Sequence, residues 1–178
     1  MSGYGQMSQY LYNKQKTDEA LRYHQEDLQP GGIGALGDGS LRRWMHTGDE
    51  GYLDPEGYFV ISGRIKDLVI RGGENISPME IEDRLVEHEA VAQASIVGAP
   101  DEKYGEELGA FVELREGYAR PSDEELRAFV REKLARFKAP RYFWWLQGDN
   151  PRVPYTWPKT TSGKVSKPDL RKLVEGLI

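Results

Sequence analysis

The chain lacks cysteine, long apolar runs and an excess of positive charge, and each absence excludes a class of protein. Without cysteine there can be no disulfide bond, thiol nucleophile or cysteine-ligated zinc. No apolar run approaches the roughly 20 residues that a membrane-spanning helix needs. The formal net charge is -5, whereas binding to a nucleic-acid backbone usually requires a basic face. These absences predict a cytoplasmic or other intracellular protein with no membrane span and no nucleic-acid partner.

Histidine is also scarce. The three histidines, His24, His46 and His88, show no metal-ligand spacing, so we expect no metal bound by protein side chains. Met1 to Gly5 lack the basic and apolar regions of a secretory signal. With 178 residues, 38% of them apolar and 30% charged, the chain has the size and composition of one domain, or of one small domain plus part of another.

Residues 1–43 are polar, rich in glycine and predicted to be mostly loop. A short helix is expected from Thr17 to Gln25, with Thr17 as its cap and Leu21 as its apolar contact. Pro30 to Gly39 contains five glycines and reads as a loop. This part of the chain cannot bury a core alone.

Regular structure is predicted from Trp44 onward. Glu50 to Ser62 has the pattern of a β-hairpin, with Asp54 to Gly57 as its turn. A further short strand, Asp67 to Arg71, ends at a pair of glycines. More strands are expected at 91–97, 108–114 and 141–146, joined to one another and to the helices by turns and loops.

Three helices are predicted after residue 76. Ser77 and Ser122 each begin a capping-box pattern, and Ser166 opens the last helix. Their expected apolar stripes are Ile81, Leu85 and Val86, then Leu126, Phe129, Val130 and Leu134, then Leu170, Leu173, Val174 and Leu177. Because helices and strands interleave around enough apolar positions, we predict an α+β fold with one compact core after residue 67.

Two charged residues near the hairpin are candidates for binding a sugar or a phosphate. Asp49 lies at the mouth of the hairpin, where a carboxylate can accept hydrogen bonds from two neighbouring hydroxyls, as on a ribose. The alternative is a turn aspartate that bonds its own backbone. The donors of Arg64 suit a sugar hydroxyl or a phosphate, although most arginines are solvated surface charges.

A glycine pair and a lysine provide the other candidates. Gly72 and Gly73 indicate either an ordinary turn or the close approach of another group to the backbone. Lys164 follows Thr160 to Gly163, a hydroxyl-rich loop, and its ammonium could neutralise charge that builds up on an α-phosphate. The alternative is a solvated loop lysine. The segment is not a phosphate-binding Walker loop, because Val165 stands where that motif requires serine or threonine.

Taken together and in order, four segments resemble the ANL superfamily of adenylate-forming enzymes, which includes acyl- and aryl-CoA synthetases, peptide-synthetase adenylation domains and luciferases. They are Tyr10 to Leu21, Trp44 to Asp49, Gly63 to Glu82 and Pro158 to Lys167. The resemblance covers nearly the whole chain. Gly72 to Ile76 looks more like the CoA ligases than the peptide-synthetase domains.

The resemblance implies a reaction in two halves: a carboxylic acid and ATP give acyl-AMP, and CoA then gives the thioester. It implies that Asp49 binds the ribose of ATP, with Arg64 nearby, and that Lys164 is the lysine of the adenylation step. ATP or AMP and CoA are the implied cofactors, and magnesium would enter only with ATP.

For the second half, the resemblance implies that Lys66 is a hinge on which a small C-terminal lid turns. Gly72, Gly73 and Glu74 then line the pantetheine tunnel used by CoA, with Arg71 close by. These roles rest on the family pattern alone.

The resemblance also implies a division of the chain. Residues 1–66 match the trailing segment of a large AMP-binding domain, and 67–178 match the mobile lid. No phosphate loop, adenine pocket or acyl pocket is found before Trp44. The first hypothesis is therefore a part of an acyl-CoA synthetase that is competent only beside a separate large domain. A non-catalytic binding module and a gene fragment that retains the lid fold are the alternatives.

Overall fold

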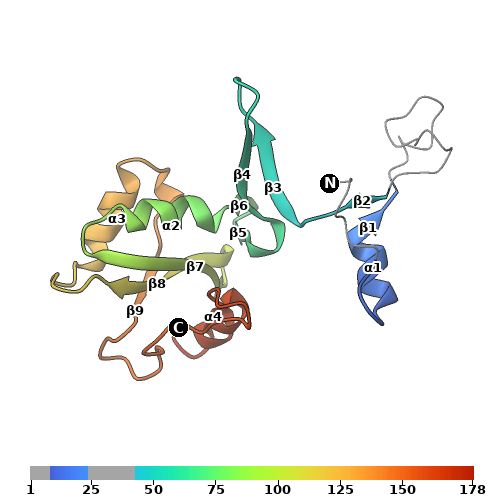
Figure 1. The fold of residues 1–178 in the computed structure, drawn as a ribbon. Coiled ribbons are helices and arrows are strands. Elements are labelled where there is room, and N and C mark those ends of the chain that lie inside the picture. The colour runs from blue at the N-terminus through green and yellow to red at the C-terminus, as the bar shows by residue number, and fades with distance from the viewer. Residues whose placement is uncertain (1–8, 24–42) are drawn as a thin grey trace. The chain divides into compact units, whose positions relative to one another are not determined.

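The structure is a computed structural model that describes residues 9–23 and 43–178. It divides into two compact units, Met1–Asp49 and Glu50–Ile178, and the site residues from Arg64 onward all lie in the second (Figure 1). The sequence predicts a different boundary, between residues 66 and 67, where a mobile lid would turn against the preceding segment. That boundary stays a prediction.

The described part of the first unit contains one helix and a two-stranded sheet. Helix α1 spans Lys14–Ala20, and β1 (Leu21–Arg22) pairs antiparallel with β2 (Trp44–Met45). The helix predicted from Thr17 was placed too late. Asn13 is the N-cap, because its side chain accepts a hydrogen bond from the Lys16 N–H, and Thr17 is buried within the helix. Leu21 belongs to β1, and the loop predicted at 30–39 lies outside the described residues.

The predicted hairpin is confirmed. Strand β3 (Asp49–Leu53) pairs with β4 (Phe59–Arg64). Asp54 fixes the turn, since its carboxylate accepts from the Tyr58 N–H at 2.7 Å and its carbonyl accepts from the Gly57 N–H at 3.0 Å. A single 3₁₀ turn, η2 (Ile65–Asp67), then leads into the main sheet.

The main sheet has five strands. Strands β7 (Val91–Asp101) and β8 (Gly105–Leu114) form its long antiparallel centre. Beside β8 lie β5 (Val69–Arg71), which meets it at Gly105, and β9 (Tyr142–Trp145), which runs parallel to it. Strand β6 (Glu74–Ile76) pairs with β5 and was not predicted.

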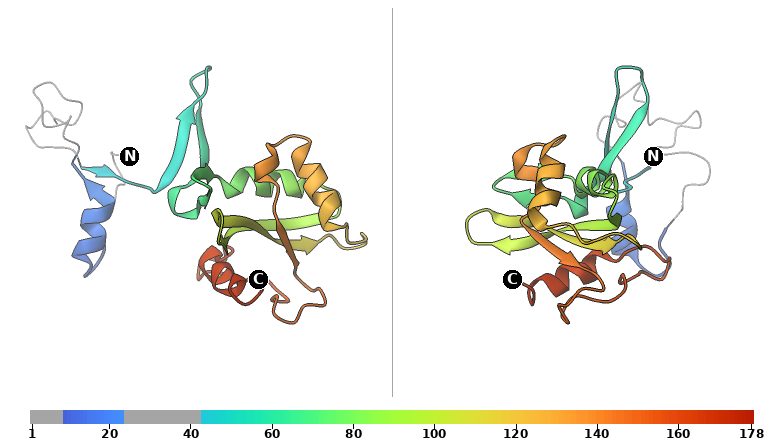
Figure 2. Two further views of the ribbon diagram at one scale, coloured as in Figure 1. Left: turned by 180° about the vertical axis from the view of Figure 1, so that it is seen from behind. Right: turned by 90° about the vertical axis from the view of Figure 1, so that its left-hand side faces the viewer.

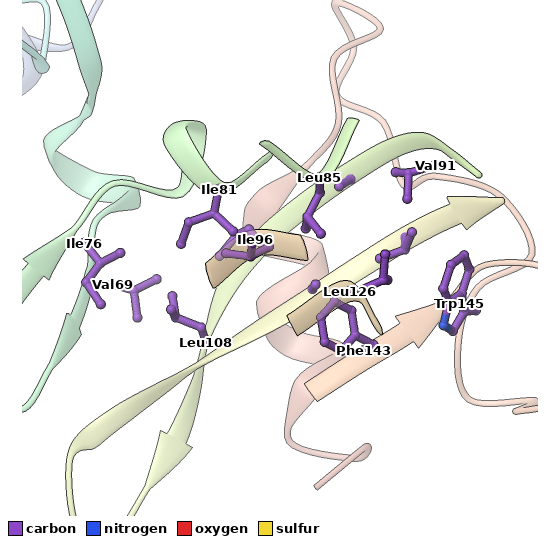
Figure 3. Close-up of a cluster of buried hydrophobic side chains, with 14 residues drawn as sticks. Val69, Ile76, Ile81, Leu85, Val91, Ile96, Leu108, Leu126, Phe143 and Trp145 are labelled. Carbon is purple, nitrogen blue, oxygen red and sulfur yellow. The ribbon is translucent and has the colours of Figure 1, made fainter. Parts of the chain in front are cut away.

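Helices cover both faces of the sheet. Helices α2 (Pro78–Val86) and α3 (Asp123–Arg131) lie on one face, α4 (Lys167–Val174) lies on the other, and η3 (Arg136–Lys138) follows α3 (Figure 2). Figure 3 shows the larger apolar cluster, in which Ile81 and Leu85 of α2 pack over Ile96 of β7. A second cluster under α4 contains Phe111, Trp144 and Leu170. The α+β fold predicted from the sequence is confirmed.

The three helix starts predicted after residue 76 are confirmed, but one predicted capping box is absent. Ser122 and Glu125 form the predicted capping box. Ser77 stands at the N-cap of α2, but its hydroxyl donates to the Ser62 carbonyl of β4, so the predicted box does not form. The buried stripe of α2 is also narrower than predicted, because Val86 is 40% exposed.

Candidate functional site

The loop that carries Lys164 is closed by hydrogen bonds. Lys159 and Val165 form an antiparallel bridge, and the Thr160 N–H donates to the Lys164 carbonyl at 2.7 Å. The Gly163 N–H donates to the Thr160 carbonyl at 2.9 Å, and Gly163 adopts φ +82°. The hydroxyl-rich loop predicted before the lysine is thus a defined turn, and α4 begins three residues after Lys164.

The Lys164 side chain extends from this turn into solvent. Its residue is exposed, and no carboxylate of residues 9–23 or 43–178 lies within ion-pairing distance of its ammonium. The neighbouring hydroxyls of Thr160 and Ser162 bond to each other at 3.0 Å. The turn therefore fixes the backbone of the lysine and leaves its charge available to a ligand.

Gly72 and Gly73 form the turn between β5 and β6. Arg71 and Glu74 are paired in register, so the two glycines are the whole loop, and their φ values are +59° and +89°. Two positive φ values in a two-residue hairpin are typical of a type I′ turn, which glycine accommodates without strain. A Cβ at Gly72 would lie 3.2 Å from the Tyr104 ring, while one at Gly73 would meet nothing within 4 Å. The turn thus packs on one side and is open on the other.

Arg71 anchors the base of this turn to β8. Its Nε and Nη2 each donate to the Glu107 carboxylate at 2.8 Å, and its guanidinium lies 4.2 Å from the centre of the Tyr104 ring. The hydrogen bond to Glu107 raises the pKa of Arg71 above its usual value. Two of the five N–H donors of Arg71 are therefore bound to a buried carboxylate.

Lys66 lies in the 3₁₀ turn between the hairpin and the main sheet, with an exposed side chain. Its carbonyl accepts a hydrogen bond from Arg171 Nη2 of α4 at 3.3 Å. The same guanidinium pairs with the Asp67 carboxylate at 3.4 Å. The residue predicted to be the hinge is therefore held from one side by the last helix.

An open cavity of about 510 Å³ extends between Lys66 and the glycine turn. Lys66 and Arg171 supply its positive charges, and Glu106 supplies a carboxylate that also accepts from the Ile70 N–H at 2.7 Å. The residues that line it are Lys66, Leu68, Ile70, Gly73, Tyr104, Gly105, Glu106 and Arg171.

The two residues predicted to bind nucleotide lie at the ends of the hairpin strands. Asp49 is partly exposed, and its N–H donates to Thr47 Oγ1 at 3.2 Å. It closes the first unit, whereas Arg64 ends β4 in the second and is exposed. Of the predicted site residues in the second unit, Lys66 and Gly73 line the same cavity. Lys164 does not line that cavity.

Sequence reasoning missed Arg171, Glu107 and the second role of Ser77. Arg171 meets Asp67 across 104 residues of sequence, and Arg71 meets Glu107 across 36. No local pattern signals such contacts, because arginine on a helix and glutamate in a strand are common and the partners are set only by the fold.

No cluster of metal-ligating side chains was found among residues 9–23 and 43–178. Within the same ranges, no helix is long and apolar enough to cross a membrane.

Comparison with known proteins identifies the second unit. Residues 80–164 match the AMP-binding enzyme C-terminal domain. The chain is 47% identical over its whole length to the acyl-CoA ligase sidI of Aspergillus fumigatus, of which it covers 28%. It is 40% identical to the putative acyl-CoA synthetase YngI of Bacillus subtilis over 96% of the chain and 26% of that protein.

A solved structure shows the same fold. The o-succinylbenzoate CoA synthetase MenE of Bacillus subtilis, in complex with the acyl-adenylate intermediate OSB-AMP, superposes with a TM-score of 0.63 at 35% identity. The match covers 80% of this chain and 26% of that one. The chain thus spans little more than a quarter of the length of these relatives.

Proposed function

The chain belongs to the ANL superfamily of adenylate-forming enzymes and carries their C-terminal domain, and on that premise we propose that it is the mobile C-terminal part of an acyl-CoA ligase. In this reaction the carboxylate displaces pyrophosphate from ATP to give acyl-AMP, and the CoA thiol then displaces AMP to give the thioester. The observation that carries the proposal is the Lys164 ammonium, exposed on a closed turn.

Lys164 serves the adenylation half. When a carboxylate attacks the α-phosphate of ATP, negative charge grows on the oxygens between them, and a cation fixed at that point stabilises the transition state. Because backbone hydrogen bonds close the turn from Lys159 to Val165, the position of the Lys164 ammonium depends mainly on the side-chain torsions of that lysine. Asp49 and Arg64 are proposed to hold the ribose and its surroundings, and magnesium would arrive with ATP.

The turn between β5 and β6 serves the thioester half. Gly73 and Glu74 are exposed, and the absence of a side chain at Gly73 lets a narrow thiol-bearing arm pass close to the backbone. Gly72 sits against Tyr104, and Arg71 ties the strand to Glu107, so these two residues position the turn. Lys66 is proposed as the hinge that exchanges the Lys164 face for this one.

A large AMP-binding domain is the proposed partner. The hairpin β3–β4 exposes apolar side chains, since Leu53, Phe59 and Ile61 are 68%, 66% and 44% exposed. Isolated two-stranded hairpins are only marginally stable in water, so this one gains from an apolar cover. We expect the chain without that partner to bind ATP more weakly than micromolar, because a few ribose contacts cannot offset the cost of immobilising a nucleotide.

The test is ATP–pyrophosphate exchange by the 178-residue chain together with the large domain of an acyl-CoA ligase, expressed separately or fused before Met1. Lys164→Ala should lower the exchange rate by about 10²–10³-fold. Lys159→Ala, which removes an exposed ammonium from the same loop, is the matched control and should leave it nearly unchanged.

Each outcome separates the hypotheses. Exchange that needs Lys164 supports the ligase assignment. If the folded chain gives no exchange with any large domain, the assignment fails and a non-catalytic module or a gene fragment remains. Equal loss in the Lys159 and Lys164 variants would mean that the loop, and not the lysine, matters.

A further inference from the structure

Two residues, Arg171 and Ser77, form hydrogen bonds on either side of the Lys66 torsions. Downstream, Arg171 of α4 binds the Lys66 carbonyl and the Asp67 carboxylate. Upstream, the Ser77 hydroxyl at the start of α2 binds the Ser62 carbonyl of β4. Helices α2 and α4 both pack on the main sheet, so both contacts tie the segment around Lys66 to one rigid body.

The contact with Arg171 survives rotation at Lys66. The φ and ψ bonds of a residue both precede its carbonyl, and the planar peptide carries that oxygen along with the next residue. The Lys66 carbonyl, Asp67 and the main sheet therefore turn together. Arg171 fixes the peptide after Lys66 to α4. Moving from the main sheet toward the hairpin, the φ and ψ torsions of Lys66 are therefore the first that Arg171 leaves free to rotate.

The contact with Ser77 does not survive such a rotation. Ser62 precedes Lys66 and stays with the hairpin, whereas Ser77 follows it and turns with the lid. The two segments approach closely here, because a Cβ at the buried Gly63 would lie 2.8 Å from Ser77 Oγ. Turning at Lys66 must break the Ser77 hydrogen bond and open this contact.

We propose that Arg171 and Ser77 are positioning residues that make Lys66 a single-point pivot. Arg171 is an anchor kept in every lid orientation, and Ser77 is a latch that stabilises only the orientation seen here. The proposal deepens the hinge role given to Lys66 and rests on that proposed function. It adds two residues that touch neither substrate nor nucleotide and that control how the lid turns.

The test uses the 178-residue chain alone and measures backbone ¹⁵N order parameters and residual dipolar couplings. In Arg171→Met, order parameters at residues 66–68 should fall from the roughly 0.85 of rigid backbone to below roughly 0.6. Lys172→Met on the same helix, which removes an ammonium that bonds Asp169, is the matched control and should change neither the order parameters nor the dipolar couplings.

In Ser77→Ala, residues 66–68 should stay ordered. The residual dipolar couplings of the β3–β4 hairpin and of the main sheet should no longer fit a single alignment tensor, which they share when the two parts are held together. Ser122→Ala weakens the fold through a distant helix cap and should leave that shared tensor intact, which separates latching from stability. The latch is refuted if the couplings of Ser77→Ala still fit a single tensor, and the anchor is refuted if residues 66–68 stay rigid in Arg171→Met. Neither measurement needs ATP or a large domain, so failure of the ATP–pyrophosphate exchange assay would leave the roles of Arg171 and Ser77 to be decided by these measurements.

Discussion

The ion pair between Arg71 and Glu107 offers the sharpest test of how the glycine turn is held. The pair has two hydrogen bonds of 2.8 Å, but its members differ in burial, since the side chain of Glu107 is 6% exposed and that of Arg71 is 21% exposed. Removing the arginine and removing the carboxylate should therefore have unequal costs, although the same two bonds are lost.

Arg71→Met leaves a buried carboxylate whose next cation is Arg141 at 4.0 Å. Breaking a buried pair in this way costs about 3–5 kcal/mol, and the lost cation–π contact with Tyr104 adds about 0.5–1 kcal/mol. Since Arg141 compensates in part, we expect about 3–4 kcal/mol. Glu107→Gln keeps one acceptor and leaves an arginine that can reach water, so we expect about 1–2 kcal/mol.

Urea unfolding followed by tryptophan fluorescence measures both values, because Trp144, Trp145 and Trp157 all lie in the cores beside this sheet. The hydrogen bond to Glu107 raises the pKa of Arg71, so the contribution of its charge is fully present at neutral pH, where the assay can be run. A loss for Glu107→Gln as large as that for Arg71→Met would refute the burial argument.

Three further outcomes are expected. Gly109→Ala places a Cβ 2.4 Å from the Trp144 ring and should lower the free energy of unfolding by about 1–3 kcal/mol in the same urea assay. At Gly73 an added Cβ meets no neighbour, so Gly73→Ala should cost only the strain of the positive φ, about 1–2 kcal/mol. Ser122→Ala breaks a complete capping box and should cost about 1 kcal/mol of unfolding free energy. Hydrogen bonds from the Tyr104 and Lys103 amides lower the pKa of Asp101 below 3.8. The Asp101 carboxylate therefore stabilises the fold fully above pH 3.8, and this contribution is lost as the pH falls through the pKa of the folded state. The difference in melting temperature between the native protein and Asp101→Asn should shrink over that fall in pH.

Local sequence patterns predicted most of the elements of the second unit. The hairpin turn depends on Asp54 and Gly57, which act within five residues of each other, and the Ser122 capping box spans four. One error has a more distant cause: Ser77 has a capping sequence, but its hydroxyl donates to the Ser62 carbonyl. The other is local, since the three residues of β6 pair with β5 across the two-residue glycine turn and were not predicted as a strand.

The candidate site divides in the same way. The family motifs located Lys164, Lys66 and the glycine turn, because each is a short segment with unusual residues. The contacts that support them were not predictable, since Arg171 and Glu107 lie far along the chain from Asp67 and Arg71. A motif identifies the residue that meets a ligand, and only the fold identifies what holds that residue.

The proposed function requires one small domain to serve two chemical steps. Its two candidate surfaces are built differently: the Lys164 turn is closed by its own backbone hydrogen bonds, while the glycine turn is braced from outside by Arg71 and Tyr104. Neither surface depends on the torsions of Lys66 for its internal geometry. If the domain turns at Lys66 as proposed, it can present either surface without rebuilding it, and a change at Lys66 should alter how often each surface is presented and not how well it is formed.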